Sequence, residues 1–540
     1  MSTLVIWLLA AAVGVSSLLA SRSLMHYFQL ESYQFAGYFR TLKRNIVRAV
    51  IPGIIMAVYL TLLLLIHRSI DRFIADASVL RLLLALAADA LAILGGWWCR
   101  SILQVKKAKK PFVVTMRVKR TYIVSAIVFT LLCAGMAFLL TGTEPRLYVV
   151  GLFPLLLPLW VALGGLCAWP IEKLVSEMYF RDAQKKLAAR PDLIKIGITG
   201  SYGKTSVKFI LGTILQEKFQ VLVTPSSFNT PMGVTRIIRE KLMPAHQVFV
   251  AEMGARHVGD IKELCRLVHP HHGVLTSVGP QHLDTFHTID RIKSTKYELM
   301  DAIPDGGCCF FPDDRAICRE LFDKTRKTKR LCSIAGSDDA DVWASDIHVS
   351  PSGSSFVLHT MTDSIPCETK LLGEHNIQNI ILAATVGIHL GMTLRQIARG
   401  ISRIAPVEHR LQLIPSPGVT IIDDAFNSNP RGAEAALKVI REFEGRRIII
   451  TPGMVELGEG EDEFNHQFGV EMADSVDVAI LVGKKHTSPI ARGLKEAGFP
   501  QENLYVVSSL DEATAILRQI GHTGDVALFE NDLPDNYSEG

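Results

Sequence analysis

The pattern of hydrophobic and polar positions divides this 540-residue chain into an apolar first third and a more polar remainder. Five long apolar runs precede residue 170, namely Leu4–Leu19, Ala49–Ile66, Val79–Trp98, Tyr122–Leu140 and Leu147–Trp169. Each is close to the ~20 residues that an α-helix needs to cross a bilayer. Buried core helices would account for one such run but not for all of them. We therefore predict a membrane region over residues 1–170 with about five transmembrane helices.

The basic residues between these runs predict how the helices are oriented. Lysines and arginines gather after the first and third runs, whereas the loops after the second and fourth carry few. Because basic loops stay on the cytoplasmic side, we expect a multi-pass protein of the cell membrane with its N-terminus outside. Everything after Trp169 should then be cytoplasmic. No basic segment precedes the first run, so it is not a typical cleavable signal peptide.

The remainder of the chain alternates between short β-rich runs and helical patterns. A linker helix is predicted over 171–191, and β-rich runs follow at 194–199, 220–225, 247–254 and 272–279. Such alternation predicts a parallel sheet flanked by helices. A second series begins after loop-rich sequence. We therefore predict an α/β architecture, with a P-loop ATP-binding central domain over 192–406 and a smaller Rossmann-like C-terminal domain over 407–540.

The segment GITGSYGKTS, at residues 197–206, has the pattern of a phosphate-binding loop. A strict Walker A motif has a further glycine where this chain has Ile198, so the loop is the shorter G-x-x-G-K-T form. Glycines let backbone N–H groups close around phosphate, Lys204 can meet the terminal phosphates, and the hydroxyl of Thr205 can hold Mg²⁺. The predicted ATP-binding residues here are Gly200, Ser201, Tyr202, Gly203, Lys204, Thr205 and Ser206.

Glu252 is a candidate metal ligand. It ends the apolar run VFVAE, which places a carboxylate at the carboxyl end of a predicted strand. Carboxylate oxygens are the ligands that Mg²⁺ prefers, so this position favours a functional role over an ordinary surface carboxylate.

Composition adds little to this picture. The net charge of +4 is small and indicates no nucleic-acid partner. The 9 cysteines include no CxxC pair, which favours reduced thiols over a disulfide framework or a zinc site.

Several motifs, in this order, resemble those of the Mur ligases, the ATP-dependent amide-forming enzymes of peptidoglycan synthesis. They span about residues 195–525 and are GITGSYGKTS, FNTPMGV, VFVAEMGARHVGDI, VGPQHLDTFHTIDRIKSTKYELM, LLGEHNIQNIILAATVG, IIDDAFNSNP and PGMVELGEGEDEFNHQFG. The resemblance is strongest to the members that add D-alanyl-D-alanine. It implies that ATP, with Mg²⁺, activates a carboxylate as an acyl phosphate, which an amine then attacks.

The resemblance also assigns roles to individual residues. It implies Lys204, Lys296 and His282 as catalytic residues, and Thr205, Glu252, His282 and Lys296 as metal-binding residues. Lys296 would be carbamylated by CO₂, although spacing alone leaves Lys293 as an alternative. The adenine is given to Asn376 and Asn379, phosphate to Arg410 and ribose to Asp424. The implied substrate-binding residues are Asn229, Asn427, Asn429 and Glu456.

Two departures from the family pattern bear on the substrate. The spans and one helix run directly into the P-loop strand, without room between them for the nucleotide-sugar domain of the members that use UDP-linked precursors. The segment FENDLPDNYSEG stands where the members that add D-alanyl-D-alanine have a K-G-S-R-like loop.

We therefore predict a ligase at the cytoplasmic membrane face, in contact with membrane lipids. It would join an amino acid or dipeptide, D-alanyl-D-alanine above all, to a soluble or lipid-linked cell-wall precursor. A Mur-like ligase of another product, such as a polyglutamate-type poly-amino acid, is the first alternative. A membrane ATPase or transporter is the second.

Overall fold

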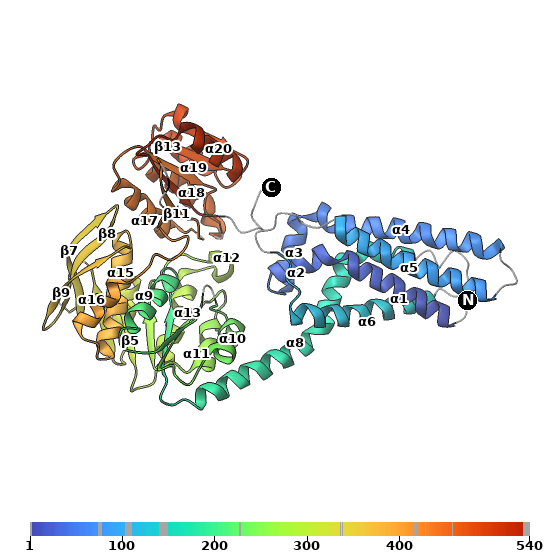
Figure 1. Ribbon diagram of the computed structural model, residues 1–540, viewed down its shortest axis with the longest axis horizontal. Coiled ribbons are helices and arrows are strands. Elements are labelled where there is room, and N and C mark those ends of the chain that lie inside the picture. Colours follow the sequence, from blue (N-terminus) through green and yellow to red (C-terminus); the bar gives the residue numbers. More distant parts are fainter. Residues whose placement is uncertain are drawn as a thin grey trace. The chain divides into compact units, whose positions relative to one another are not determined.

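The structure, a computed structural model, describes residues 3–73, 78–102, 111–139, 150–225, 228–334, 336, 339–414, 416, 418–426, 428–455 and 457–532. The chain forms two compact units, Met1–Glu177 and Met178–Gly540 (Figure 1). We call them the helical unit and the α/β unit.

The helical unit consists of helices, several of which are long and apolar. They are α1 (Thr3–Ala20), α2 (Arg22–Leu30), α3 (Phe35–Arg44), α4 (Ile46–Phe73), α5 (Ser78–Ile102), α6 (Met116–Leu139), the short η2 (Phe153–Leu156) and α8 (Leu157–Ala188). Among the described residues, 4 helices are long and apolar enough to cross a membrane, and α1 with α2, bent by 52°, makes a fifth only if the pair is one span. The first predicted run therefore does not stand as a straight span by itself.

The helix predicted as a separate linker over 171–191 is the end of α8. This helix runs from Leu157 to Ala188 with Pro170 inside it. A proline removes one backbone hydrogen bond, which a long helix tolerates when the turns on either side are well formed. The sequence changes from apolar to amphipathic near residue 170, but the helix continues through this point.

A 9-stranded sheet forms the first part of the α/β unit, in the order β2-β3-β1-β4-β5-β6-β7-β8-β9. The strands are β1 (Ile194–Thr199), β2 (Val221–Val223), β3 (Val248–Glu252), β4 (His272–Leu275), β5 (Cys308–Pro312), β6 (Lys329–Ser333), β7 (Val342–Ser350), β8 (Gly353–Thr360) and β9 (Ser364–Thr369). The pairs from β2 to β7 are parallel, and β7, β8 and β9 are antiparallel. The parallel sheet was predicted; the antiparallel extension, whose strands are only half buried, was not.

The second part of the α/β unit is a 6-stranded sheet in the order β10-β11-β15-β12-β13-β14. Its strands are β10 (Gln412–Ile414), β11 (Thr420–Asp424), β12 (Arg447–Thr451), β13 (Val478–Val482), β14 (Leu504–Val507) and β15 (Val526–Glu530). Only β10 is antiparallel to its neighbour. Helices lie along both sheets (Figure 1). The predicted α/β architecture, a parallel-sheet domain followed by a smaller α/β domain, is confirmed.

Alternating side chains of the central strands pack into two separate cores. Val248 and Val250 of β3 belong to one apolar cluster, and Phe249 and Ala251 belong to another. Since successive side chains of a strand point to opposite faces, the two clusters cover the two faces of the sheet. The carboxyl ends of β1, β3 and β4 are therefore held in a rigid layer.

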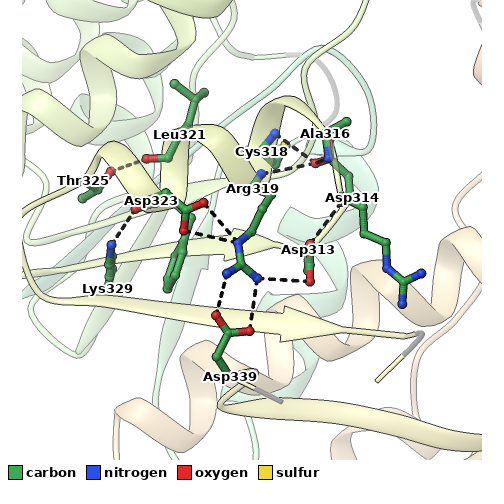
Figure 2. A network of polar contacts seen from close by, with 12 residues as sticks. Asp313, Asp314, Ala316, Cys318, Arg319, Leu321, Asp323, Thr325, Lys329 and Asp339 are labelled. Atoms are coloured by element: carbon green, nitrogen blue, oxygen red, sulfur yellow. Dashed lines mark hydrogen bonds and ion pairs between the residues drawn. The ribbon is translucent and has the colours of Figure 1, made fainter. Parts of the chain in front are cut away.

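A polar network follows β5 at this same edge of the sheet (Figure 2). One oxygen of Asp314 accepts hydrogen bonds of 2.9–3.3 Å from three backbone N–H groups at the start of α14 (Ile317–Lys324). Arg319 pairs with Asp339 at 2.6 Å, Asp323 at 3.2 Å and Asp313 at 3.5 Å. These carboxylates cap and anchor a helix, so we assign them a structural role.

Candidate functional site

The loop between β1 and α9 (Lys204–Leu215) has the geometry of a phosphate cradle. Gly200 and Gly203 have φ angles of 152° and 78°, which favour glycine. A Cβ on Gly200 would lie 2.1 Å from Thr276 Oγ1, and one on Gly203 would lie 2.9 Å from Asn379 Oδ1. Glycine at these positions therefore lets the loop adopt its backbone conformation and pack closely against Thr276 and Asn379.

Hydrogen bonds hold this loop against the segment that follows β4. Ser201 donates its backbone N–H to Ser277 O at 2.8 Å and its hydroxyl to Gly279 O at 3.0 Å. Tyr202 donates its N–H to Ser277 Oγ at 2.9 Å and its hydroxyl to Pro280 O at 2.9 Å. The side chains of Ser201 and Tyr202 thus position the loop.

Lys204 closes the cradle. Its ammonium group donates to the carbonyl oxygens of Gly200 and Ser201, both at 2.7 Å. Burial of the ammonium lowers the pKa of Lys204 to about 8, although the nearby Glu252 carboxylate opposes this shift. The lysine therefore stays mostly protonated near neutral pH and can pair with phosphate oxygens.

Glu252 lies at the end of β3 and gathers donors from three other segments. Its carboxylate accepts from Lys208 Nζ at 2.8 Å, from Asn229 Nδ2 at 3.0 Å and from Thr205 Oγ1 at 3.1 Å. Burial alone would raise the pKa of Glu252, but Lys208, Lys204 and Asn229 hold it below its usual value. Glu252 is thus ionised, as a metal ligand must be.

The pair of Thr205 and Glu252 fits Mg²⁺. Mg²⁺ is usually held by one or two protein oxygens, and phosphate and water fill its remaining positions. The described residues contain no group of three or more His, Cys, Asp or Glu side chains that could hold a metal. A magnesium site here therefore depends on the nucleotide for further oxygens.

Lys296 lies on α13 (Ile289–Ala302) and is buried. Burial and the charge of Lys204 lower the pKa of Lys296 well below its usual value, against the pull of Asp260 and Glu298. Lys293, the alternative on the same helix, instead pairs with Glu320. Burial therefore favours the neutral amine at Lys296, which is the form that reacts with CO₂.

His282 and Glu298, which precede and follow Lys296 in the sequence, lie in different surroundings. His282 precedes α12 (Leu283–Phe286) and has a φ angle of 55°. Glu298 accepts hydrogen bonds from the backbone of Gly259 at 2.9 Å and Lys262 at 2.8 Å, next to α11 (Asp260–Val268). Glu298 thus anchors a neighbouring helix, and the proposed role of His282 stays a prediction.

The two asparagines assigned to adenine differ in their surroundings. Both lie on α15 (Glu374–His389). Asn376 is buried and donates to Leu372 O at 2.8 Å, whereas the side-chain oxygen of Asn379 lies beside Gly203 of the P-loop. Asn379 therefore lines the cradle, and Asn376 fastens the start of its own helix. Adenine binding by the pair stays a prediction.

Residues of the second sheet reach the cradle. Arg410 acts electrostatically on Lys204 and Glu252, and its guanidinium lies 4.7 Å from the ring centroid of Phe426. Asp424 ends β11, where burial and the nearby Glu530 carboxylate raise its pKa well above the usual value. Arg410, which precedes β10, therefore adds a positive charge to the cradle formed beside the first sheet.

The predicted substrate-binding residues lie in different places. Asn229 contacts Glu252, as described above, and so belongs to the surroundings of the metal pair. Asn429 caps α17 (Pro430–Arg441), where its oxygen accepts from Gly432 N at 3.0 Å. Asn427 and Glu456 lie outside the described residues.

Two features of the site were not anticipated. Lys208 is the fully buried partner of Glu252, and a lone lysine in the apolar helix GKTSVKFIL was the available signal. Glu530 ends β15 and accepts hydrogen bonds from the hydroxyls of Ser428 and Thr451. Burial raises the pKa of Glu530 to about 7.

Comparison with known proteins agrees with this geometry. Residues 198–387 match the Mur ligase middle domain, and residues 409–530 match the Mur ligase glutamate ligase domain. The UDP-N-acetylmuramoyl-tripeptide–D-alanyl-D-alanine ligase of Escherichia coli K12 is 30% identical over 306 residues, which are 56% of this chain and 67% of that protein. The corresponding Mycobacterium tuberculosis H37Rv ligase is 30% identical over 62% of this chain and 69% of its own length.

Solved structures show the same fold. MurF from Acinetobacter baumannii has a TM-score of 0.61 and 25% identity, and the match covers 67% of this chain and 79% of that one. MurF from Thermotoga maritima, solved in complex with ADP, has a TM-score of 0.60 and 23% identity over 67% and 82% of the two chains.

Proposed function

Because this chain belongs to the Mur ligase family of ATP-dependent ligases, we propose that it joins D-alanyl-D-alanine to the peptide of a peptidoglycan precursor. The observation that carries the ligase chemistry is the assembly of Lys204, Thr205 and Glu252 around a glycine cradle that Arg410 approaches from the second sheet. The identity of the relatives supports this pair of substrates.

The reaction joins a carboxylate to an amine in two displacements. A carboxylate oxygen of the precursor attacks the terminal phosphorus of ATP, so that ADP leaves and an acyl phosphate forms. The amine of the dipeptide then attacks the acyl carbon, the amide bond forms, and inorganic phosphate leaves with the amine's proton passing to solvent. The first step brings anionic oxygens together, and the second builds negative charge on the acyl oxygen and the departing phosphate, so neutralising charge is the main task of the protein.

The residues of the cradle perform this task. The loop backbone and Lys204 bind the phosphates, and Arg410 adds a second cation from the other sheet. Thr205 and Glu252 would hold Mg²⁺, which supplies positive charge to the phosphate oxygens when bound. Lys208 and Asn229 keep Glu252 ionised and fixed in direction.

Lys296 would contribute as a carbamate. A neutral lysine amine adds to CO₂, loses a proton and becomes an anionic carboxylate. The depressed pKa of Lys296 supplies the neutral amine, and the nearby charge of Lys204 stabilises the resulting anion. Lys296 would then act as a further oxygen ligand beside the phosphates.

The candidate spans of the helical unit support a location of this ligase at a membrane. Its 4 candidate spans, or 5 with the bent pair, carry large apolar side chains on their outer surfaces, among them Leu62, Leu94, Ile123 and Leu159. The basic residues that follow the first and third apolar runs in the sequence support an N-terminus outside the cell and an α/β unit in the cytoplasm, where ATP is present. Membrane lipids would surround the helical unit.

A second candidate function has one observation in its favour. Family members that add D-alanyl-D-alanine have a basic K-G-S-R-like loop at the position of Glu530 and Asn531. In this chain Glu530 lies close to Asp424. A carboxylate in place of a cation suits an amine that carries less negative charge than D-alanyl-D-alanine. A ligase of another cell-envelope product is therefore the alternative.

The test is phosphate release by the detergent-solubilised full-length protein with ATP and Mg²⁺. The panel combines UDP-linked or lipid-linked muramoyl-tripeptide with D-alanyl-D-alanine or glutamate, and Lys204→Ala is the control. We expect release that requires a tripeptide precursor and D-alanyl-D-alanine together. Release that requires glutamate instead would support the alternative, and no release above the control with any pair would contradict the proposal.

A further inference from the structure

A cluster of arginines and aromatic rings lies at one end of the helical unit, and the ligase chemistry does not use it. Arg22 begins α2, Arg117 and Arg120 lie in the first turns of α6, and Glu172 lies on α8 beyond Pro170. Successive candidate spans cross a membrane in alternating directions, so these four residues fall on the same side of it. It is the side from which α8 continues into the α/β unit.

The arginines are held in defined positions. Arg120 donates two hydrogen bonds to Glu172, at 2.6 and 2.8 Å, in the bidentate arrangement typical of guanidinium and carboxylate. Arg117 Nε lies 3.8 Å from the same carboxylate, and its guanidinium lies 4.0 Å from the ring centroid of Tyr33. One buried carboxylate therefore faces two arginines.

Two polar atoms of this cluster lack a hydrogen-bond partner within the described part of the chain. Arg117 Nε and the hydroxyl of Tyr33 are buried, and neither makes a hydrogen bond within the described part of the chain. A buried donor without an acceptor destabilises the folded protein. The two groups, stacked on each other, therefore have unused capacity to donate to an acceptor oxygen.

Phe112 forms the wall beside Arg22. The guanidinium of Arg22 lies 5.5 Å from the ring centroid of Phe112, which also contacts His26 and Tyr122. The backbone next to Phe112 is fixed, since Gln29 Nε2 donates to Val113 O at 2.8 Å and Val113 N donates to Gln29 Oε1 at 3.2 Å. The cluster is thus a built arrangement and not only a run of basic residues.

Charge and apolar surface coincide here. Residues 1–177 contain 18 lysines and arginines against 7 acidic residues. Next to the cluster along the chain, Met116, Trp169 and Leu174 are 65%, 52% and 72% exposed. Cations beside exposed apolar side chains, at the end of candidate spans, match a lipid with an anionic headgroup.

We propose that Arg22, Arg117, Arg120 and Tyr33 bind the phosphate or diphosphate of an anionic polyprenyl-type lipid, and that this lipid carries the carboxylate donor of the ligase. The statement that this lipid carries the carboxylate donor rests on the proposed function, whereas the statement that these residues bind its phosphate does not. Arginine forks match phosphate oxygens in geometry as well as charge. The same phosphate chemistry occurs in UDP, so the experiment must separate the two sources.

The test measures binding to the full-length protein in phosphatidylcholine nanodiscs, without ATP. The ligands are polyprenyl diphosphate, UDP and phosphatidylglycerol, and the variant is Arg117→Gln. The matched control is Lys119→Gln, which removes one charge from an exposed position on the same helix. A further variant, Arg117→Lys, keeps the positive charge but removes the planar guanidinium, which can donate two parallel hydrogen bonds.

We expect polyprenyl diphosphate to bind more tightly than the other two ligands. Arg117→Gln should weaken its Kd about tenfold or more, Arg117→Lys should weaken it less, and Lys119→Gln should leave it within about twofold. Equal losses in Arg117→Gln and Lys119→Gln would overturn the site, because bulk charge would then explain binding. Competition by UDP at equal affinity would overturn the assignment to a lipid.

Phosphate release is measured separately on the same preparations. Lys204→Ala should bind polyprenyl diphosphate as the unmodified protein does, because the ATP cradle is not part of the lipid site. Lipid binding without any ligase activity would contradict the proposed function alone, and ligase activity without lipid binding would contradict this inference alone.

Discussion

Lys208 and Glu252 form an ion pair of 2.8 Å with side chains that are 0% and 1% exposed. The lysine comes from the first helix after the P-loop and the carboxylate from the end of a neighbouring strand. Such a pair is expensive to desolvate and adds little net stability over an apolar pair. We infer that it is present because the site needs an ionised and fixed Glu252.

Removing one partner of this pair should be costly. Lys208→Met leaves a buried carboxylate without its cation, so we expect a loss of about 3–5 kcal/mol in the free energy of unfolding. The double variant Lys208→Met with Glu252→Leu should lose much less free energy of unfolding than the two single variants lose in total. Urea unfolding of all three variants gives the coupling energy, and Lys241→Met, at an exposed lysine, is the control. Additive losses would show that the pair is not coupled.

Asn229 should act through Glu252 and not through the nucleotide directly. Asn229→Ala removes the hydrogen bond to Glu252 Oε1 and leaves the cradle intact. We expect the Mg²⁺ concentration for half-maximal activity to rise about tenfold, on the scale known for residues that orient metal ligands. Nucleotide affinity measured with EDTA present should not change. A loss of that metal-free affinity would instead place Asn229 on the substrate.

The reactivity of Lys296 predicts a dependence on CO₂. In buffers freed of CO₂ and bicarbonate, ligase activity should fall and should return when bicarbonate is added. The chemical signature is a carbamate carbon in a ¹³C NMR spectrum recorded with ¹³CO₂. Lys296→Arg should show neither the rescue nor the signal, and Lys293→Arg should show both. A carbamate signal that persists in Lys296→Arg would contradict the assignment.

Glu530 should make the stability of the α/β unit depend on pH. Its pKa rises from 4.5 to about 7 in the folded protein, mainly through burial, so the folded state binds a proton that the unfolded state has lost. Stability from this group is therefore present at low pH and declines as pH rises from 4.5 to about 7, by about 3 kcal/mol at most.

Glu530→Gln, which stays neutral, should remove this decline. The free energy of unfolding of the unmodified protein and of Glu530→Gln is measured by chemical unfolding between pH 5 and 8. Subtracting one free energy from the other cancels the contributions of other titrating groups. A difference that does not change with pH would show that Glu530 is ionised throughout the range.

The sequence by itself determined the chemistry-bearing segments and the two-part plan. Residues 200–206 are a phosphate loop because a strand, two glycines and a lysine occur in a fixed local order, and local order is visible without a fold. Glu252 could be predicted because it ends an apolar strand. The long apolar runs of the first third indicated membrane helices, since length and composition alone decide whether a helix can cross a bilayer.

Only the tertiary structure decided which residues meet. Lys293 and Lys296 look equivalent in sequence, but in the structure Lys293 pairs with Glu320 and Lys296 is buried. Asn376 and Asn379 share a helix, yet only Asn379 lines the P-loop. The buried partnership of Lys208 with Glu252 and the approach of Arg410 from the second sheet depend on how strands and domains pack. Contacts between distant segments are set by that packing, which no local pattern encodes.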